Sequence, residues 1–259
     1  MTQAGDLLDL AVHAAHEAGR LLARRFASAP TGVRTKSTST DLVSDADTEA
    51  ERAILDVIRA ARPGDGWLGE EGAAGESRSG LTWVVDPLDG TVNYLFRIPV
   101  WAVSIAVDDG DGTLAGVVHD PLRGETFSAT RGGGAFLNGD RISVRETEDL
   151  ETSLIGTGFA YDRATRAAQA EVVARVLPRV RDVRRAGSAA LDLCSVACGR
   201  FDGFYEANME RWDKAAGILL VEEAGGVTST LPNPVAGSDG VVAAGPALHP
   251  QLADLVQGA

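Results

Sequence analysis

The sequence predicts an α/β protein, of the α+β kind, in which layers of helices pack against a mainly antiparallel sheet. Amphipathic helical patterns fill residues 6–61, short apolar runs separated by glycine turns fill residues 80–145, and helical and strand patterns alternate after that. This order is neither a regular strand–helix alternation nor an all-strand chain. With 259 residues, 44% of them hydrophobic, the chain can bury a sizeable core. We expect one domain over residues 1–259, with a weak internal boundary near residues 145–152.

Two amphipathic helices are expected at the start of the chain. Residues 6–26 and 47–61 place apolar side chains at helical spacing on one face and mostly polar or charged side chains on the other. A Pro-Gly-Asp-Gly sequence at residues 63–66 ends the second helix. Residues 27–40 are polar and rich in Ser, Thr and Gly, which fits a loop or a short hairpin between the two helices.

The middle of the chain is expected to be mainly strand. A short apolar segment at residues 67–69 is followed by the two acids Glu70 and Glu71. A flexible loop rich in Gly and Ser then extends to residue 80. Beyond it, apolar runs bounded by Gly, Asp and Pro predict strands. The expected strands are residues 82–86, 101–108, 113–120, 125–130 and 135–137. Glycines favour a hairpin turn at residues 110–112, and a helix is expected to start after Gly90.

The second half of the chain alternates between the two element types. Strands are expected at residues 153–157, 201–206 and 241–244, and helices at residues 165–176, 188–198, 213–224 and 250–256. Gly225 and Gly226 provide the expected stop for the third of these helices. The sequence contains no internal repeat and no low-complexity linker that would separate independent domains.

The charge balance limits the kinds of partner. Lys and Arg number 24 against 37 Asp and Glu, which gives a net charge of −13. Such a chain is a poor match for nucleic acid or for an anionic membrane, so neither is expected as a partner. Most of the acids are interpreted as solvated surface groups, including the pairs Asp108/Asp109 and Glu222/Glu223.

Cysteine usage and the N-terminal sequence favour a soluble protein of the cytoplasm. The two cysteines, Cys194 and Cys198, lie in an apolar helical segment and are interpreted as reduced core residues. The four histidines are scattered and have no zinc-site spacing with the cysteines. The chain begins without a basic region followed by an apolar run, and it has no uninterrupted apolar stretch of membrane-spanning length.

Acidic residues occur in four segments, and three of these follow or end an apolar run. They are Asp41/Asp45/Asp47, Glu70/Glu71, Asp86/Asp89 and Asp213. Carboxylates in such partly buried positions are costly unless a cation or hydrogen bonds compensate them. If they converge, they would hold roughly two to three Mg²⁺ ions, which can clamp a phosphate and activate water. Taken alone, residues 86–91 are explained equally well by a strand-to-helix turn with an aspartate cap.

Several segments, in a defined order along nearly the whole chain, resemble the motifs of a known protein family. They are Asp41-Leu42-Val43-Ser44 with Asp47, Gly69-Glu70-Glu71, Trp83-Val84-Val85-Asp86-Pro87-Leu88-Asp89-Gly90-Thr91 with Asn93, and Trp212-Asp213 ahead of Glu223-Ala224-Gly225-Gly226. In these segments the chain resembles the inositol monophosphatase family of Mg²⁺-dependent, lithium-sensitive phosphatases. The resemblance implies a layered αβαβα sandwich, the fold of inositol monophosphatase and fructose-1,6-bisphosphatase, and it implies a homodimer.

The same resemblance implies a set of metal ligands. Glu70, Asp86 and the backbone carbonyl of Leu88 match the ligands of a first Mg²⁺ ion. Asp86, Asp89 and Asp213 match those of a second ion, so that Asp86 bridges the two. Glu70 also matches a position that helps to hold a third, weaker ion, whereas Glu71 is expected to point away from the metals.

Catalytic and phosphate-binding positions are implied in the same way. Thr91 and Asp47 match the pair that orients and deprotonates the attacking water, which Glu70 helps to align. The backbone amides of Gly90 and Thr91 match a phosphate cradle at a helix N-terminus. Lys36 matches a basic residue near the metals, although a surface loop lysine is the alternative interpretation.

The alcohol part of the substrate is specified less strongly. Gly187, Ser188, Ala189 and Glu206 match positions that contact it, and Asp89 offers a further acceptor. These residues favour a phosphate ester of a polyol such as inositol 1-phosphate. Glu206 lies at an expected strand end, where a solvated acid is an equally good interpretation.

Two other functions remain open from the sequence. Fructose 1,6-bisphosphate, histidinol phosphate and 3′-phosphoadenosine phosphates are hydrolysed on similar scaffolds. Relatives that act on the last two often have Lys at the position of Val92, so its absence favours inositol-type or sugar phosphates. A non-catalytic regulatory binding protein is the second alternative, because some bacterial relatives act through protein or RNA-machinery partners. The presence of every expected ligand and of the Thr91–Asp47 pair favours the enzyme.

Overall fold

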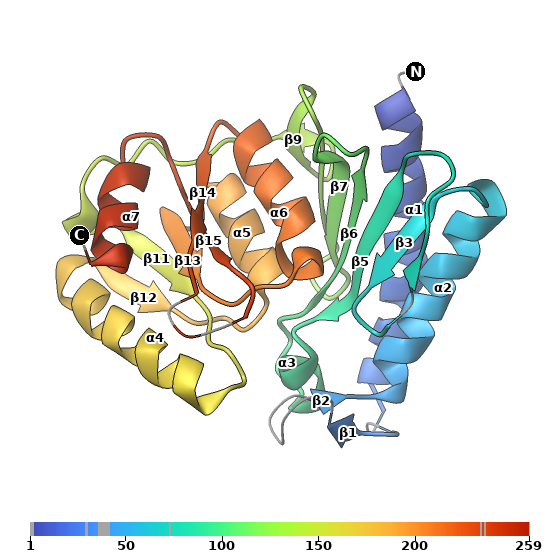
Figure 1. The fold of residues 1–259 in the computed structure, drawn as a ribbon, viewed down its shortest axis with the longest axis horizontal. Helices are drawn as coiled ribbons and strands as arrows, with labels where there is room; N and C mark the ends of the chain where they lie inside the picture. The colour runs from blue at the N-terminus through green and yellow to red at the C-terminus, as the bar shows by residue number, and fades with distance from the viewer. Residues whose placement is uncertain are drawn as a thin grey trace.

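The computed structural model describes residues 3–28, 31–35, 42–72, 74–233, 235 and 237–258. In this part of the chain five layers alternate between helices and sheets, as expected (Figure 1). Helices α1 (Gln3–Phe26) and α2 (Asp45–Ala61) cover the outer face of an eight-stranded sheet. Helices α5 (Ala189–Ala197) and α6 (Arg211–Glu223) lie between it and a five-stranded sheet, and α4 (Arg163–Val176) and α7 (His249–Gln257) cover the far side.

The eight-stranded sheet is antiparallel except where β3 pairs with β5. Its strands, in spatial order, are β10 (Asp140–Arg141), β9 (Gly134–Leu137), β8 (Glu125–Thr130), β7 (Thr113–Asp120), β6 (Ala102–Asp108), β5 (Thr82–Asp89), β3 (Gly66–Gly69) and β4 (Ala74–Gly75). Helix α3 (Thr91–Leu95) follows β5 directly. Strands β1 (Arg34–Thr35) and β2 (Leu42–Val43) form a separate antiparallel pair, which agrees with the expected short hairpin.

The five-stranded sheet mixes parallel and antiparallel pairs. Its spatial order is β12 (Asp182–Arg184), β11 (Leu154–Thr157), β13 (Gly203–Glu206), β15 (Gly240–Ala244) and β14 (Val227–Leu231). The first three strands are parallel, and the last two pair antiparallel with their neighbours. Short 3₁₀ helices at Leu150–Thr152 and Leu177–Arg179 precede two of these strands.

A bulge in β5 shapes the end of the larger sheet. Asp86 pairs with Ser104 and Asp89 pairs with Ala102, so β5 contains one residue more than the facing part of β6. Residues three apart in a regular strand point to opposite faces, and the extra residue removes that alternation. Pro87 lies inside the bulge, where the sheet does not need its missing N–H group. As a result, Asp86 and Asp89 face the same side of the sheet, and Leu88 turns into the core beneath α1 and α2.

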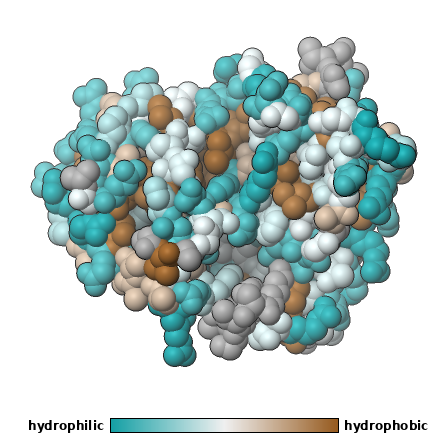
Figure 2. Space-filling view, viewed as in Figure 1, coloured by the Kyte–Doolittle hydropathy of each residue, from teal (hydrophilic) through white to brown (hydrophobic). Residues whose placement is uncertain are grey.

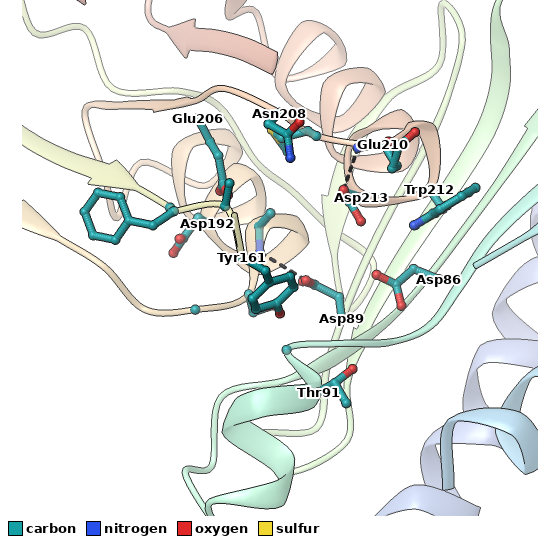
Figure 3. Close-up of a pocket in the computed structure, with 18 of the residues that line it drawn as sticks. Asp86, Asp89, Thr91, Tyr161, Asp192, Glu206, Asn208, Glu210, Trp212 and Asp213 are labelled. Atoms are coloured by element: carbon teal, nitrogen blue, oxygen red, sulfur yellow. Dashed lines mark hydrogen bonds between the residues drawn. The ribbon is translucent and has the colours of Figure 1, made fainter. Parts of the chain in front are cut away.

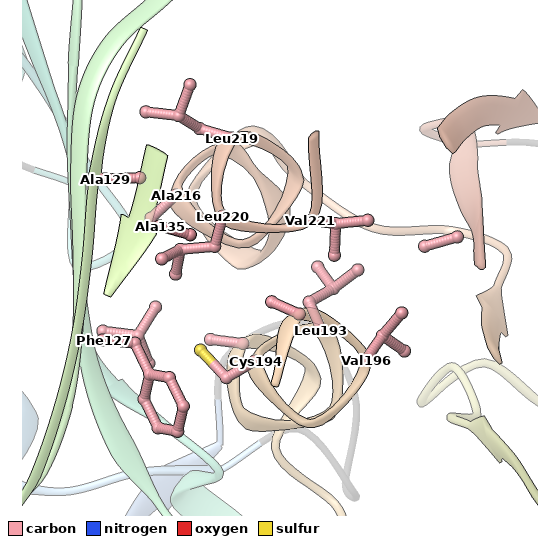
Figure 4. Close-up of a cluster of buried hydrophobic side chains, with 14 of the residues drawn as sticks. Phe127, Ala129, Ala135, Leu193, Cys194, Val196, Ala216, Leu219, Leu220 and Val221 are labelled. Carbon is pink, nitrogen blue, oxygen red and sulfur yellow. The ribbon is translucent and has the colours of Figure 1, made fainter. Parts of the chain in front are cut away.

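Apolar side chains fill the spaces between the layers. In β5, Trp83 and Val85 pack toward α1 and α2, whereas Val84 packs toward the central helices. Burial on both faces explains why this strand is a continuous apolar run instead of an alternating one. Figure 4 shows the central core, where Phe127 and two alanines of the larger sheet face Leu220 of α6 and Cys194 of α5. Both cysteines are free thiols, and burial raises the pKa of each of them.

Several sequence expectations need correction. The strands at Asp182–Arg184 and Val227–Leu231 were not expected, because the first is short and charged and the second is rich in Thr and Ser. The apolar step at residues 67–69 is a true strand of the larger sheet.

The interpretation of Asp108 as a solvated surface group was wrong, whereas Glu223 is partly exposed and is also bonded to a neighbouring turn. Asp108 is buried and accepts hydrogen bonds from Arg211 and, at 2.9 Å, from Thr113. Glu223 accepts bonds from the backbone N–H groups of Gly132 at 2.6 Å and Gly134 at 2.7 Å, and it thereby joins α6 to the β8–β9 turn.

The visible surface of the protein is largely polar. Hydrophilic residues cover much of the face seen in Figure 2, with hydrophobic residues scattered between them. Among the helices of the described residues, none combines the length and the hydropathy needed to cross a membrane.

Candidate active site

A cavity of about 360 Å³ opens where the end of β5 faces the N-terminal ends of α5 and α6 (Figure 3). Segments far apart in the sequence therefore meet at one place. Of the residues expected to form a site, those that line this cavity are Glu70, Asp86, Leu88, Asp89, Gly90, Thr91, Gly187, Ser188, Ala189, Glu206 and Asp213.

Four of the acids that line the cavity, Glu70, Asp86, Asp89 and Asp213, are called the acidic wall here. The Asp86 side chain is 2% exposed, and its Oδ1 atom accepts a hydrogen bond of 2.9 Å from the N–H group of Leu88. Burial raises the pKa of Asp86 well above its usual range, and the nearby Glu70, Asp89 and Asp213 raise it further. Like charges in a low-dielectric site resist ionisation together, so the wall is costly to charge without a cation.

Asp89 is held by the first turn of α5. Its carboxylate accepts hydrogen bonds from the Ser188 hydroxyl and from the backbone N–H groups of Ala189, at 3.2 Å, and Ala190, at 2.9 Å. An acid at a helix N-terminus is stabilised by the free N–H groups and by the helix dipole. Burial nevertheless outweighs these bonds and raises the pKa of Asp89 to about 6. Ser188 and Ala189, expected to touch substrate, thus also orient Asp89.

Asp213 sits in the first turn of α6. Its Oδ2 atom accepts a hydrogen bond of 2.7 Å from the N–H group of Glu210, as Figure 3 shows. Burial raises the pKa of Asp213 well above its usual range, with Glu70 and Asp89 as the largest electrostatic contributions. Figure 3 shows the Asp213, Asp86 and Asp89 side chains projecting toward a common space.

Glu70 follows β3 at the edge of the cavity, and Glu71 is not part of the lining. Glu51 of α2, which is 6% exposed, holds the turn that follows β3. Its Oε1 atom accepts a hydrogen bond of 3.1 Å from the N–H group of Glu71. The same atom would lie 2.0 Å from a Cβ at Gly69, so only glycine fits there beside Glu51. Sequence reasoning did not identify Glu51, because it is one of many acids on an amphipathic helix.

Thr91, Asp47 and Ser44 form a buried hydrogen-bonded chain behind the acidic wall. The Thr91 hydroxyl is 3.0 Å from Asp47 Oδ1 and 3.0 Å from the carbonyl oxygen of Leu88. The other Asp47 oxygen accepts bonds from the N–H group and the hydroxyl of Ser44, at 2.9 and 2.7 Å. Burial raises the pKa of Asp47, and its bonds to Ser44 and Thr91 oppose that rise. Ser44 and Asp47 also cap α2.

Gly90 is required by the turn from β5 into α3. Its φ angle is +95°, a conformation that residues with a side chain rarely adopt. A Cβ at this position would lie 3.0 Å from the Val100 carbonyl oxygen and 3.2 Å from that of Gly187. The glycine therefore allows the turn that carries Thr91 to lie close to the segment just before α5.

Glu206 and Asp192 occupy the side of the cavity away from Asp86, as Figure 3 shows. Burial raises the pKa of Glu206 to about 8, and it raises the pKa of Asp192 well above its usual range. The positive charge of Arg185, which also lines the cavity, opposes both shifts. The sequence analysis did not identify Asp192, although an acid inside the apolar segment 189–197 is a usable signal of a buried functional group.

The donor set fits a hard divalent cation. One side of the cavity has the carboxyl groups of the acidic wall together with Leu88, whose backbone carbonyl is a further donor, and such oxygen ligands suit Mg²⁺. Within the part of the chain that the structure describes, however, no three acidic, histidine or cysteine side chains are gathered closely enough to hold an ion as they stand. Besides burial, Glu70 and Asp89 raise the pKa of both Asp86 and Asp213, as nearby like charges do. Lys36 and Asp41 lie outside the described residues.

The metal-free protein is expected to lose stability as the pH rises from 6.5 to 8.5. Burial raises the pKa of Glu206 to about 8, inside this window, and it raises the pKa values of Asp86 and Asp213 well above their usual range. The pKa of Asp89, about 6, lies below the window, so its contribution is already lost at pH 6.5. A carboxyl whose pKa is raised by folding stabilises the fold fully below its unfolded pKa, and this contribution is lost as the pH rises through the folded pKa. The buried His119, whose pKa is lowered to about 4, is neutral throughout this window and does not oppose the trend.

Melting curves with EDTA and with Mg²⁺ at pH 6.5 and 8.5 test this expectation. We expect Tm in EDTA to be lower at pH 8.5, by about 2–4 °C for each kcal/mol lost. Added Mg²⁺ should raise Tm more at pH 8.5, because it binds the charged carboxylates of the folded state. Equal Tm values in EDTA at the two pH values, with equal Mg²⁺ effects, would show that these acids are not coupled to a cation.

Comparison with known proteins identifies relatives in both sequence and structure. The profile of the inositol monophosphatase family matches residues 4–259. The chain is 45% identical over 238 residues to the inositol-1-monophosphatase of Mycobacterium leprae, covering 87% of this chain and 81% of that protein. It is 43% identical over 225 residues to the Nus factor SuhB of Escherichia coli, covering 86% and 84%. The crystal structure of the extragenic suppressor protein suhB of Bartonella henselae has a TM-score of 0.92 at 38% identity, covering 97% and 98% of the two chains.

Proposed function

This chain belongs to the inositol monophosphatase family, and on that premise we propose that it is a Mg²⁺-dependent phosphomonoesterase. The proposed substrate is inositol 1-phosphate or a related polyol or sugar phosphate. The observation that carries the proposal is the Thr91–Asp47 hydrogen bond of 3.0 Å directly beside the acidic wall of the cavity.

The acidic wall would hold the metal. Glu70, Asp86 and the Leu88 carbonyl would bind one Mg²⁺, and Asp86, Asp89 and Asp213 a second, with Glu70 assisting a third, weaker ion. When bound, Mg²⁺ would neutralise the phosphate oxygens and lower the pKa of a water that attacks phosphorus. Asp89 would be oriented for metal binding before the ion arrives, because its carboxylate accepts three hydrogen bonds from the start of α5.

Thr91 would position the attacking water. Its single hydroxyl hydrogen is directed to Asp47 or to the Leu88 carbonyl, both 3.0 Å away. The oxygen can then only accept a hydrogen bond from water, which leaves a lone pair of that water free to face phosphorus. Asp47 would receive the proton through Thr91, since a buried carboxyl with a raised pKa is a suitable base.

The phosphate would lie against the start of α3. The first N–H groups of a helix have no partner within the helix, and they favour an anion. Gly90 and Thr91 occupy this position and line the cavity. In-line displacement then needs no covalent intermediate on the protein, in agreement with a cavity that contains neither cysteine nor histidine among its described lining residues.

A phosphate-release screen with Mg²⁺ tests the proposal. The substrates are inositol 1-phosphate, fructose 1,6-bisphosphate, histidinol phosphate and 3′-phosphoadenosine 5′-phosphate, with EDTA as the control. We expect Mg²⁺-dependent release with the highest kcat/KM for inositol 1-phosphate. Val92, in place of the lysine common in relatives that act on nucleotides or histidinol phosphate, supports this order. A kcat/KM that favours the nucleotide would overturn the substrate and leave the phosphatase class standing.

A regulatory role without catalysis is the competing function. The relative from Escherichia coli is named a Nus factor, so a place in a transcription complex is a specific alternative. The complete ligand set and the intact Thr91–Asp47 pair favour an enzyme, and a net charge of −13 disfavours direct contact with RNA. Absence of phosphate release from all four substrates, with Mg²⁺ present, would favour the regulatory function.

By the family resemblance we also propose that the protein is a cytoplasmic homodimer and that lithium inhibits its phosphatase activity.

A further inference from the structure

Two acids one turn apart on α2 bond to two different segments of the candidate site. Helix α2 packs against β5 (Figure 1), and Asp47 and Glu51 share one face of it because four residues separate them. Both side chains are buried. Asp47 accepts the hydrogen bond from Thr91, whereas Glu51 accepts one from the turn that follows β3. Neither acid lines the cavity, so each acts through the segment that it holds.

The turn that follows β3 is held at two successive N–H groups. The N–H group of Glu70 donates a hydrogen bond of 3.1 Å to the carbonyl oxygen of Val85 in β5. The N–H group of Glu71 donates a hydrogen bond of 3.1 Å to Glu51 Oε1. With both N–H groups held, the backbone between them has a fixed orientation. Glu70 lines the cavity and Glu71 does not, so this orientation decides which of the two acids faces the acidic wall.

Close packing fixes the position of the Glu51 carboxyl group. A Cβ on Gly69 would lie 2.0 Å from Glu51 Oε1 and 2.7 Å from the indole nitrogen of Trp67. The carboxyl group and the indole ring therefore both lie against this glycine. Trp67 is 4% exposed and belongs to the core between the larger sheet and the outer helices. In such a close-packed interior Glu51 is a rigid support for the turn.

We propose that Glu51 is a positioning residue for Glu70, because it holds the backbone at Glu71 so that the Glu70 carboxyl group faces the cavity, ready to bind metal. The inference rests on the proposed phosphatase function and adds to it a residue outside the cavity. Asp47 holds Thr91 from the preceding turn of the same helix. Helix α2 would thereby also fix the spacing between a proposed metal ligand and the residue that would orient water. Loss of a group that orients a metal ligand typically weakens metal binding by about 10–100-fold.

Metal affinity provides the first test. The quantity measured is the Kd for Mn²⁺ alone, by electron paramagnetic resonance on protein treated with EDTA and then freed of it. Glu51→Met keeps much of the side-chain volume but has no oxygen to accept the Glu71 bond, and it should raise this Kd about tenfold or more. Glu51→Ala should give a rise of the same order. Glu51→Gln should stay within about threefold of the wild type, because a glutamine carbonyl oxygen can accept the same bond.

Kinetics separate positioning from a general loss of structure. In Glu51→Met the Mg²⁺ concentration for half-maximal phosphate release should rise about tenfold, while kcat at saturating Mg²⁺ stays within about threefold of the wild type. Glu49→Ala is the control for loss of an acid from α2, since Glu49 pairs with Arg25 near the surface. Ile58→Val is the control for lower stability, because it removes a buried methyl group from the same helix. Both controls should leave the Mn²⁺ Kd and the half-activation unchanged.

Crystal structures of the metal-free variants complete the test. Glu51→Met should show the Glu70 carboxyl group displaced from the cavity, whereas Glu51→Gln should keep it in place. A wild-type protein that binds no Mn²⁺ or releases no phosphate contradicts the proposed function, and the position of Glu70 in the crystals then decides the inference alone. An unchanged Mn²⁺ Kd in both Glu51→Met and Glu51→Ala, an equal rise in Ile58→Val, or a Glu70 that keeps its place would overturn the positioning role.

Discussion

Asp86→Asn is expected to reduce kcat/KM for phosphate release by about 10³-fold or more while leaving the protein folded. Asp86 would be the ligand shared by two ions, and each metal supplies several kcal/mol of charge stabilisation in the transition state. The substitution should also raise the Tm of the metal-free protein, because burial and the neighbours Glu70, Asp89 and Asp213 make the Asp86 carboxyl costly to ionise in the fold, and an amide carries no such cost. Opposite effects on activity and on metal-free stability distinguish a functional acid from a structural one.

Phosphate release at saturating Mg²⁺ and calorimetry in EDTA measure the two effects. Asp120→Asn is the matched control, because Asp120 is also a fully buried aspartate at a strand end but does not line the cavity. One of its oxygens accepts hydrogen bonds from the N–H groups of Leu122, at 2.9 Å, and Arg123, at 3.0 Å, and asparagine can keep both, so its change should leave turnover near that of the wild type. Full turnover by Asp86→Asn at saturating Mg²⁺ would exclude a bridging ligand at this position.

Thr91→Ala is expected to lower kcat by about 10²–10³-fold with little change in the Mg²⁺ concentration needed for half-activation. The hydroxyl bonds to Asp47 and to the Leu88 carbonyl, and in the proposed mechanism it accepts a hydrogen bond from water but does not bind metal. Its loss therefore removes an orientation that matters only in the transition state. The measurement is kcat as a function of Mg²⁺ concentration for the variant and the wild-type protein.

Thr91→Ser is the control for this change. Serine keeps the hydroxyl and loses one methyl group, so it should recover most of the lost kcat, whereas alanine and valine should not. If Thr91→Ala instead weakens Mg²⁺ activation and keeps kcat at saturation, Thr91 supports the metal site through Leu88 and has no direct role with water.

The regular elements could be predicted from the sequence where burial imposes a clear pattern. Trp83, Val84 and Val85 form a continuous apolar run because helices cover both faces of β5. Val227–Leu231 gave no such signal, since Thr and Ser alternate with few apolar residues on this edge strand. Asp108 was misjudged for a related reason, because its burial depends on Arg211, which lies more than 100 residues away along the chain.

The candidate site was predictable in composition but not in its supporting contacts. The acids at the end of β5 were identifiable from their position after an apolar run. The bulge at Pro87, which directs Asp86 and Asp89 into one cavity, depends on pairing with β6 and has no local signal beyond the proline. The bonds from α5 to Asp89 span about a hundred residues and could not be inferred from spacing.

Anomalous diffraction from crystals soaked in Mn²⁺, in place of Mg²⁺, tests the central claim most directly. The account places the strongest anomalous peak in the cavity, in contact with the carboxylate of Asp86 and flanked by Glu70 and Asp213, and it expects that peak to disappear in Asp86→Asn. A strongest peak elsewhere on the protein, or one that persists unchanged in Asp86→Asn, would contradict a metal-dependent phosphatase site at the end of β5.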